Sequence, residues 1–377
     1  MSETCFITPV GKYELLRYPV RKKELLRAWD AADEYLLHHL HEQQFDHQHT
    51  LILNDSFGAL AVALHQFSPI SWSDSWLAHE ALRENLTRNA CDIGGAAMLP
   101  STQAPHESPS LVLIKVPKSL ALLEDQLIRL KPLLAPHCRV IVAGMVKTMP
   151  SSLWKMLEKI IGPTETSLAR KKARLIEVQV DPLLPLAENP FPRRWRLEDS
   201  PFEIINHANV FSRERLDIGT RFLLQHLPRT EGHVDIIDLG CGNGLLGMMA
   251  AQQNPEASLH FVDESYMALA SARANFRQLD ANLSRAQFQL GDGLKGFDKD
   301  AADLILCNPP FHQSHAVGDT VALSMFMQSA RVLRNGGALW VVGNRHLDYH
   351  FKLKRWFGSV DVVVSNKKFV VLKATAE

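Results

Sequence analysis

A mostly apolar segment that runs directly into a glycine-rich loop constrains the fold of this chain more than any other feature. The segment Val234–Leu239 is followed by Gly240, Gly242 and Gly244. Glycine lets the backbone take positive φ angles and lets a ligand approach the main chain closely. In open α/β sheets, ligands bind beyond the carboxyl ends of the strands. The segment therefore predicts a buried strand, a ligand-binding loop and a helix, in that order.

The rest of the second half alternates strand-like and helix-like segments. Short apolar segments typical of buried strands cover residues 258–262, 302–307 and 338–343. Ser265–Leu279 has helical periodicity, with Leu269, Ala272 and Phe276 on one stripe. This alternation predicts a mostly parallel sheet with helices on both faces, the doubly wound α/β class.

Length and composition favour two ordinary globular domains. The 377 residues exceed the roughly 250–300 that one core usually reaches. Apolar residues make up 46% and charged residues 22%, which are globular values. Five scattered cysteines without metal or redox spacing, no 18-residue apolar stretch and no signal-like start favour a cytoplasmic protein. Four prolines within residues 181–192 predict a linker between domains over 1–180 and 193–377.

The two halves resemble copies of each other, because six short segments recur in the same order. Any two α/β domains share part of this rhythm, but six ordered matches favour a duplication. The first half keeps only Gly58 of the three loop glycines, and it has Lys115 where the second half has Asn308. We therefore expect the second half to hold the working site and the first to be a degenerate copy. The matched pairs are Leu53–Leu60 with Leu239–Leu246, Ser73–Trp76 with Asp263–Tyr266, Arg83–Leu86 with Arg273–Phe276, Ile114–Pro117 with Cys307–Pro310, Val142–Gly144 with Val341–Gly343, and Gly162 and Lys171–Lys172 with Gly358 and Lys367–Lys368.

Two kinds of ligand suit the glycine loop. Gly242-x-Gly244-x-x-Gly247 matches the dinucleotide fingerprint, with Asp263 following 21 residues after Gly242. That fingerprint places its first glycine directly after the strand, however, and here that glycine is Gly240. Asp238, just before it, would repel a pyrophosphate and attract the ammonium and sulfonium groups of S-adenosylmethionine. Asp263 can accept hydrogen bonds from ribose hydroxyls in either case.

The segment Asn308-Pro309-Pro310-Phe311 follows the strand-like residues 302–307. The prolines fix the backbone and leave carbonyl oxygens free to accept hydrogen bonds. Asn308 adds a side-chain acceptor, and Phe311 adds a stacking face. Together they suit a planar group with an exocyclic amine, such as a nucleobase. A proline-locked turn is the alternative, and the nucleotide-type loop before it makes that reading less favoured.

In this order, the motifs resemble those of Rossmann-like methyltransferases. The resemblance is strongest to the bacterial two-domain ribosomal RNA guanine-N2-methyltransferases, which also carry segments like Val210–Arg213 and Leu216–Gly219 before the loop. Trp29–Leu37, Arg345–Tyr349 and Lys367–Phe369 resemble the large-subunit branch of that family. Asn-Pro-Pro-Phe also occurs in adenine-N6 and glutamine methyltransferases, so this motif alone does not choose the acceptor.

The resemblance implies two tandem Rossmann-like methyltransferase domains, with S-adenosyl-L-methionine as cofactor and 23S rRNA as partner. It implies that Asp238 and the loop glycines bind the methionine part, Asp263 the ribose and Asp292 the adenine amino group. Asn308 and the Pro309 carbonyl would hold a guanine amine, and Phe311 would stack on the base. The full implied set is Asp238, Gly240, Cys241, Gly242, Asn243, Gly244, Asp263 and Asp292 for the cofactor, and Asn308, Pro309, Pro310 and Phe311 for catalysis.

The charge balance limits how RNA could be bound. With 41 basic and 41 acidic residues, the chain needs a local patch for RNA, and Arg193–Arg196 with its tryptophan is the candidate. A cluster of five histidines within residues 38–49 is better read as helix surface than as a metal site. The alternatives are a 16S rRNA substrate, a nicotinamide oxidoreductase, and an RNA-binding assembly factor with a vestigial pocket. We expect no metal, no membrane and no obligate protein partner.

Overall fold

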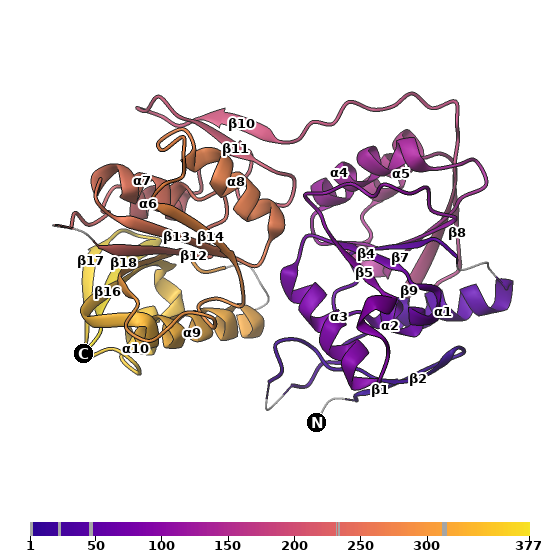
Figure 1. The fold of residues 1–377 in the computed structure, drawn as a ribbon, viewed down its shortest axis with the longest axis horizontal. Coiled ribbons are helices and arrows are strands. Elements are labelled where there is room, and N and C mark those ends of the chain that lie inside the picture. The colour runs from indigo at the N-terminus through magenta and orange to yellow at the C-terminus, as the bar shows by residue number, and fades with distance from the viewer. Residues whose placement is uncertain (1–2, 22–23, 45–47, 231, 233, 311–314) are drawn as a thin grey trace. The chain divides into compact units, whose positions relative to one another are not determined.

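The computed structural model describes residues 3–21, 24–44, 48–230, 232, 234–310 and 315–377. The chain forms two compact units, Met1–Phe191 and Pro192–Glu377, which are described separately below (Figure 1). Residues 181–192 contain no helix or strand. The core clusters of the first unit are drawn from residues 6–180 and those of the second from residues 197–376. Each unit therefore has a hydrophobic core of its own.

The first unit is built on a seven-stranded sheet in the order β5-β4-β3-β6-β7-β9-β8. The first five strands in this order are parallel, and β9 is antiparallel to both of its neighbours. The strands are β3 (Thr50–Leu53), β4 (Ile70–Ser73), β5 (Ala97–Pro100), β6 (Leu111–Lys115), β7 (Arg139–Met145), β8 (Thr164–Thr166) and β9 (Ala173–Gln179), preceded by the hairpin β1 (Cys5–Thr8) and β2 (Gly11–Glu14). The helices are α1 (Ala31–Gln43), α2 (Ala59–Ala63), α3 (Trp76–Arg88), α4 (Leu120–Leu130) and α5 (Ser151–Ile160).

The second unit repeats this topology, with the order β14-β13-β12-β15-β16-β18-β17. Strand for strand, the two orders correspond, so the predicted duplication and the mostly parallel α/β fold are confirmed. The strands are β12 (Asp235–Leu239), β13 (Ser258–Asp263), β14 (Ala286–Leu290), β15 (Ala302–Cys307), β16 (Leu333–Asn344), β17 (Ser359–Ser365) and β18 (Phe369–Thr375), preceded by the hairpin β10 (Arg193–Arg196) and β11 (Glu203–Asn206). The helices are α6 (Ile218–Leu224), α7 (Leu245–Gln253), α8 (Tyr266–Phe276), α9 (His315–Val332) and α10 (Tyr349–Leu353).

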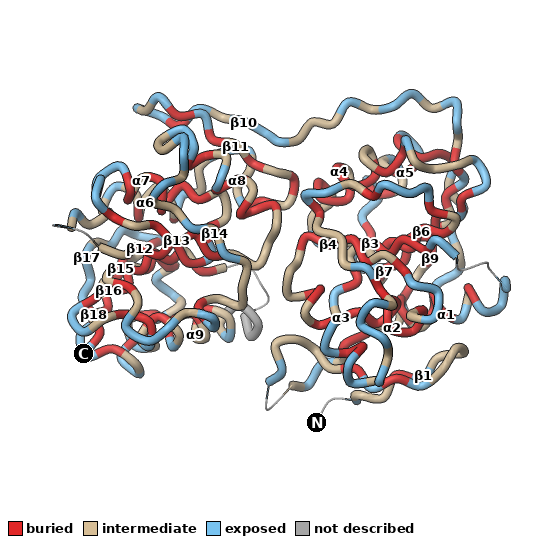
Figure 2. The backbone as a smooth tube through the Cα atoms, viewed as in Figure 1, coloured by how far each residue is buried: buried red, intermediate tan, exposed pale blue. Residues whose placement is uncertain are grey.

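The core of the second unit has two layers because successive strand residues point to opposite faces of the sheet. In β12, Ile236 belongs to a cluster with Phe276, whereas Ile237 belongs to a cluster with Phe326 and Leu353. Both faces of the sheet are thus covered, and buried residues concentrate along the central strands (Figure 2). The predicted stripe on α8 is buried, as expected for a helix packed on the sheet.

One glycine is common to both loops because helix packing requires it. Gly58 and Gly244 precede α2 and α7 with φ angles of +78° and +75°. A Cβ added to Gly58 would lie 2.9 Å from the Leu82 Cα, and one added to Gly244 would lie 2.9 Å from the Ala272 Cα. The close approach of α2 to α3, and of α7 to α8, therefore excludes larger residues.

Candidate functional site

Three predicted motifs meet at one edge of the second sheet. In the parallel ladder, Leu239 of β12 is paired with Val262 of β13 on one side and with Cys307 of β15 on the other. The loops that follow these three strands therefore begin side by side at the same edge of the sheet. They carry the glycine loop, Asp263 and Asn308, as expected for ligand binding at strand carboxyl ends.

Asp238 is a buried acceptor with unused capacity. Asp238 is only 1% exposed. Its Oδ2 accepts a hydrogen bond of 2.8 Å from the Gly247 amide. Its Oδ1 is buried without a partner among the described residues. Burial raises the pKa of Asp238 to about 8; the Gly247 bond opposes this rise, and the Asp263 charge adds to it. An ammonium or sulfonium group would compensate the buried carboxylate.

The glycine loop leaves room above its backbone. Gly240 and Gly242 have φ angles of +69° and +54°, a region that L side chains rarely adopt. A Cβ added to Gly242 would meet nothing within 4 Å, so packing does not explain this glycine. At Gly240 the added atom would lie 3.1 Å from the Met325 Cε. The open side at Gly242 fits close approach by a ligand.

Two further loop residues have structural contacts. The Asn243 Nδ2 donates to the Asn206 Oδ1 at 2.9 Å, and its Oδ1 accepts from the Leu245 amide at 3.2 Å. Asn243 therefore fixes the turn from β12 into α7. The Cys241 thiol is buried, and burial together with the nearby carboxylates raises its pKa well above the usual value. Cys241 is accordingly a packing residue of the loop rather than a thiolate nucleophile.

The same loop in the first unit is filled by side chains. Asn54 stands where the second unit has Gly240 and keeps the left-handed backbone, with φ +62°. Asn54 and Gln126 exchange two amide hydrogen bonds, of 2.8 and 3.1 Å. Asparagine is among the few residues that tolerate this backbone region. The loop shape therefore persists without the glycine, while side chains occupy its surroundings.

Asp263 and Asp292 are both held by neighbouring groups. The Asp263 carboxylate accepts from the Gly242 amide at 2.9 Å and from the Ser265 amide at 3.0 Å, and each oxygen can accept a further bond. Gln328 of α9 fixes the Asp292 loop: its Nε2 donates to the Asp292 carbonyl at 3.3 Å, and its Oε1 accepts from the Leu294 amide at 2.6 Å. Sequence reasoning missed Gln328, because nothing in its local pattern distinguishes it from other polar helix residues.

Asn308 follows β15 directly and is bound to the start of α6. Its Nδ2 donates to the Thr220 Oγ1 at 2.9 Å and to the Asp217 Oδ2 at 3.3 Å. Its Oδ1 is buried and has no partner among the residues that the structure describes. Pro309 is buried and Pro310 is half-buried, whereas Phe311 lies outside the described residues. The motif thus offers an unused acceptor next to the glycine loop.

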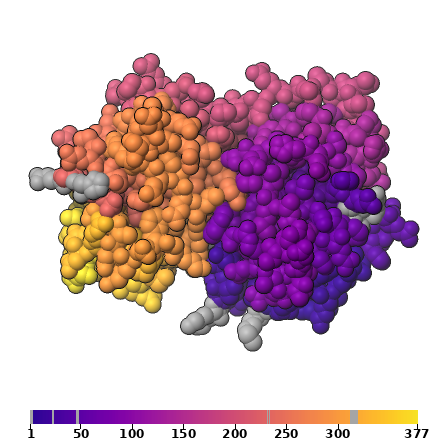
Figure 3. Space-filling view, viewed as in Figure 1, coloured from indigo at the N-terminus to yellow at the C-terminus, as the bar shows by residue number. Residues whose placement is uncertain are grey.

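The candidate RNA patch Arg193–Arg196 combines exposed arginines with a half-buried tryptophan. The three arginines of β10 are exposed. The segment that carries them lies at the surface of its unit (Figure 3). Trp195 is half-buried against the cluster that contains Leu197 and Phe202. Its ring therefore contacts the core of its unit, because neighbouring residues of a strand face opposite sides of the sheet.

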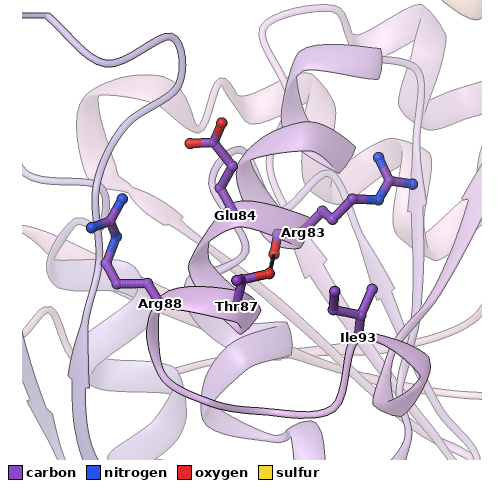
Figure 4. Close-up of a pocket in the computed structure, with 5 residues that line it drawn as sticks. All are labelled: Arg83, Glu84, Thr87, Arg88 and Ile93. Carbon is purple, nitrogen blue, oxygen red and sulfur yellow. Dashed lines mark hydrogen bonds between the residues drawn. The ribbon is translucent and has the colours of Figure 1, made fainter.

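The first unit has a hollow on its surface. It is lined by α3 residues and by Ile93, and the Thr87 hydroxyl there donates to the Arg83 carbonyl at 2.9 Å (Figure 4). Within the described ranges, no group of three or more His, Cys, Asp or Glu side chains is arranged to hold a metal ion. No described helix is both long and apolar enough to cross a bilayer.

Full-length relatives identify the family. The chain is 51% identical over 371 residues to ribosomal RNA large subunit methyltransferase G of Pseudomonas paraeruginosa, which covers 98% of this chain and 99% of that protein. It is 47% identical over 376 residues to the protein of the same name from Streptomyces coelicolor, covering 98% and 100%. The chain belongs to the ribosomal RNA large subunit methyltransferase G family. The models for the RLMG N-terminal domain and the methyltransferase small domain match residues 3–182 and 201–373 of this family member.

A solved structure shows the same two-unit fold. The 16S rRNA N2 G1207 methyltransferase of T. thermophilus, solved with AdoMet and guanosine, is 21% identical and superposes with a TM-score of 0.77. The match covers 99% of this chain and 98% of that one. Membership of the methyltransferase G family makes this chain an S-adenosylmethionine-dependent methyltransferase and removes the nicotinamide oxidoreductase alternative. The unpartnered Asp238 Oδ1 and the open space at Gly242 fit that cofactor.

Proposed function

We propose that this enzyme methylates the N2 exocyclic amine of a guanosine in 23S rRNA. One observation carries the choice of an amine as the methyl acceptor: the buried Asn308 Oδ1 has no partner among the described residues. An exocyclic amine donates two hydrogen bonds. The unused Asn308 Oδ1 and the Pro309 carbonyl would supply the two acceptors that it needs. The names of the relatives, which specify the large ribosomal subunit, support the choice of RNA.

The cofactor would be held by residues from three strand ends. Asp238 and the glycine loop would bind the methionine part, Asp263 the ribose and Asp292 the adenine amine. Cys241 and Asn243 would shape the loop. When bound, S-adenosylmethionine supplies an electrophilic methyl group. The buried acceptors and the open backbone at Gly242 support this assignment.

The residues of the Asn-Pro-Pro motif would prepare the nucleophile. A guanine amine is weakly nucleophilic because its lone pair is delocalised into the ring. The Asn308 Oδ1 and the Pro309 carbonyl would accept hydrogen bonds from its two N–H groups, orient the amine and increase electron density on its nitrogen. Fixing the reacting group in this way contributes several kcal/mol. Pro310 would stiffen the turn and Phe311 would stack on the base, which must be unpaired or flipped out.

The first unit would serve RNA recognition rather than cofactor binding. Its loop position equivalent to Gly240 carries Asn54, paired with Gln126. Its position equivalent to Asn308 carries Lys115, whose ammonium forms ion pairs with two carboxylates. We assign residues 1–180 to substrate recognition, 181–192 to the linker and 193–377 to catalysis. Methylation of ribosomal RNA would take place in the cytoplasm and needs no metal or obligate protein partner.

A direct assay tests this proposal. The purified enzyme is incubated with methyl-labelled S-adenosylmethionine and with separated, unmodified 23S and 16S rRNA, and the nucleosides are analysed by mass spectrometry. We expect label in N2-methylguanosine from 23S rRNA alone. Label from 16S rRNA alone would replace the substrate but keep the chemistry. Absence of label from both RNAs, with cofactor binding intact, would overturn the proposed function and favour a binding or assembly role.

A further inference from the structure

The first turn of α6 controls the orientation of the Asn308 amide. Asp217 is the N-cap of this helix, and its Oδ2 accepts from the Thr220 amide at 2.8 Å and from the Thr220 hydroxyl at 3.3 Å. The Thr220 Oγ1 in turn accepts from the Asn308 Nδ2 at 2.9 Å, and the Asp217 Oδ2 accepts from the same nitrogen at 3.3 Å. Three side chains thus form one hydrogen-bonded chain that ends on a carboxylate.

This chain allows only one of the two amide orientations. A carboxylate only accepts hydrogen bonds, so the group facing Asp217 must be the NH2 of Asn308. The Thr220 hydroxyl donates its one hydrogen to Asp217. Toward Asn308 it can therefore only accept a hydrogen bond, which the Asn308 NH2 donates. A flipped amide would place its oxygen against two acceptors. The Asn308 Oδ1 is therefore turned to the opposite side, where it is buried without a described partner.

The first unit has the same connection with a different outcome. Lys115 ends β6 as Asn308 follows β15, and its Nζ lies 2.8 Å from the Oδ1 of Asp30 and 2.6 Å from the Oδ1 of Asp33. Asp30 is the N-cap of α1, as Asp217 is of α6, and Asp33 follows three residues later, as Thr220 does. An ammonium has no lone pair to offer. The equivalent position therefore links strand and helix but presents no acceptor.

We propose that Asp217 and Thr220 are positioning residues that hold the Asn308 Oδ1 ready to accept from the guanine amine. This inference rests on the proposed function. Polarisation along the hydrogen-bonded chain also favours this positioning role, since a hydrogen bond to a carboxylate polarises the groups that donate to it. The Asn308 NH2 is thereby fixed by two acceptors, and the Asn308 Oδ1 becomes a stronger hydrogen-bond acceptor.

The test separates turnover from cofactor binding. Thr220→Val keeps the side-chain shape and removes the hydroxyl, whereas Thr220→Ser keeps the hydroxyl. Measurements on the full chain are kcat and KM with unmodified rRNA, the S-adenosylmethionine Kd by titration calorimetry, and the melting temperature. We expect Thr220→Val to lower kcat roughly tenfold or more, with the Kd changed less than about twofold. Thr220→Ser should restore kcat to within about threefold of the wild type.

A matched pair of cap variants provides the control. Serine is a good N-cap residue but is too short to reach across as aspartate does. Asp217→Ser and Asp30→Ser therefore make the same change at equivalent helix starts, and we expect only Asp217→Ser to lower kcat. If Thr220→Val fails to fold, this pair decides alone.

The outcomes distinguish this inference from the proposed function. A wild-type enzyme that forms no N2-methylguanosine in rRNA overturns the proposed function. With an active wild type, unchanged kcat in both Thr220→Val and Asp217→Ser overturns the positioning role. An equal loss in Thr220→Ser, or a loss of cofactor affinity parallel to the loss of kcat, also overturns it, because either result indicates a general structural effect.

Discussion

Asn85 of α3 and Asn275 of α8 make the same three hydrogen bonds in the two units. Each side chain binds both the amide and the carbonyl of one residue in or just after the hairpin that opens its unit. Each also donates to a carbonyl of the loop before the preceding helix, α2 or α7. For Asn85 the partners are the Leu16 amide at 3.0 Å, the Leu16 carbonyl at 2.9 Å and the Phe57 carbonyl at 2.9 Å. For Asn275 they are the Ile205 amide at 2.7 Å, the Ile205 carbonyl at 3.0 Å and the Asn243 carbonyl at 2.9 Å.

Alanine at these two positions should have equal effects on stability and unequal effects on cofactor binding. Each change leaves three partly buried backbone groups without this partner, which costs about 2–4 kcal/mol. Only Asn275→Ala also releases the Asn243 carbonyl in the predicted cofactor loop. We expect it to weaken S-adenosylmethionine binding by roughly tenfold in calorimetry, while Asn85→Ala leaves the Kd unchanged. Equal Kd values for the two variants would contradict the role of this contact.

Binding of the cationic cofactor should release a proton from Asp238. Because burial raises its pKa to about 8, the carboxyl is largely protonated at pH 7, and a cation favours the charged form. The apparent affinity should therefore rise between pH 6 and pH 8. Calorimetry at pH 7 in buffers of different ionisation enthalpy measures the protons released, and Asp238→Asn serves as the control. Equal proton release by wild type and variant would rule out this linkage.

The same group should make folding stability depend on pH. Its pKa is about 8 in the folded chain and near the ordinary 3.8 when unfolded, so the folded state holds the proton that the unfolded state loses. This contribution to stability is complete below about pH 4 and decreases as the pH rises towards 8. Replacing Asp238 with Asn should flatten the melting temperature across that range. A variant with the wild-type slope would assign the pH dependence to other groups.

Removing the Asn308 amide should affect chemistry far more than cofactor binding. Asn308→Ala eliminates the unpartnered oxygen proposed to hold the guanine amine, so kcat should fall roughly 100-fold or more. Its contacts are with Asp217 and Thr220, neither of which is assigned to the cofactor. Single-turnover methylation and cofactor titration measure the two effects separately. A decrease in kcat of less than about threefold would remove Asn308 from its proposed role.

The second unit should fold and bind cofactor when produced alone. Its buried core residues lie within 197–376, so a fragment of residues 193–377 retains its apolar packing. We expect the S-adenosylmethionine Kd of this fragment to stay within about threefold of the full chain. RNA affinity, measured by filter binding at fixed salt, should fall at least roughly tenfold. Undiminished RNA affinity would contradict substrate recognition by the first unit.

The sequence predicts the fold well because strand alternation and glycine loops are local signals. The predicted strand 302–307 matches β15. The matched segments also hold equivalent places in the two sheets, since Leu53 pairs with Ile114 as Leu239 pairs with Cys307. Contacts between distant segments have no such signal. Gln328 reaches the Asp292 loop, and Thr220 reaches Asn308, only because the topology brings α9 and α6 to the same sheet edge. The half-burial of Trp195 against the core likewise depends on which face of its strand points inward, and composition does not reveal that.

The glycine shared by both loops separates two kinds of constraint within one molecule. Gly58 and Gly244 are both present because neighbouring helices leave no room for a Cβ. Gly240 and Gly242 have no glycine counterpart in the first unit, where Asn54 and Ser56 stand instead. The two units therefore form a comparison within one chain: both keep the glycine that helix packing requires, whereas side chains replace the other two loop glycines in the first unit. The equivalent position in the first unit thus gives each candidate site residue a control within the same chain.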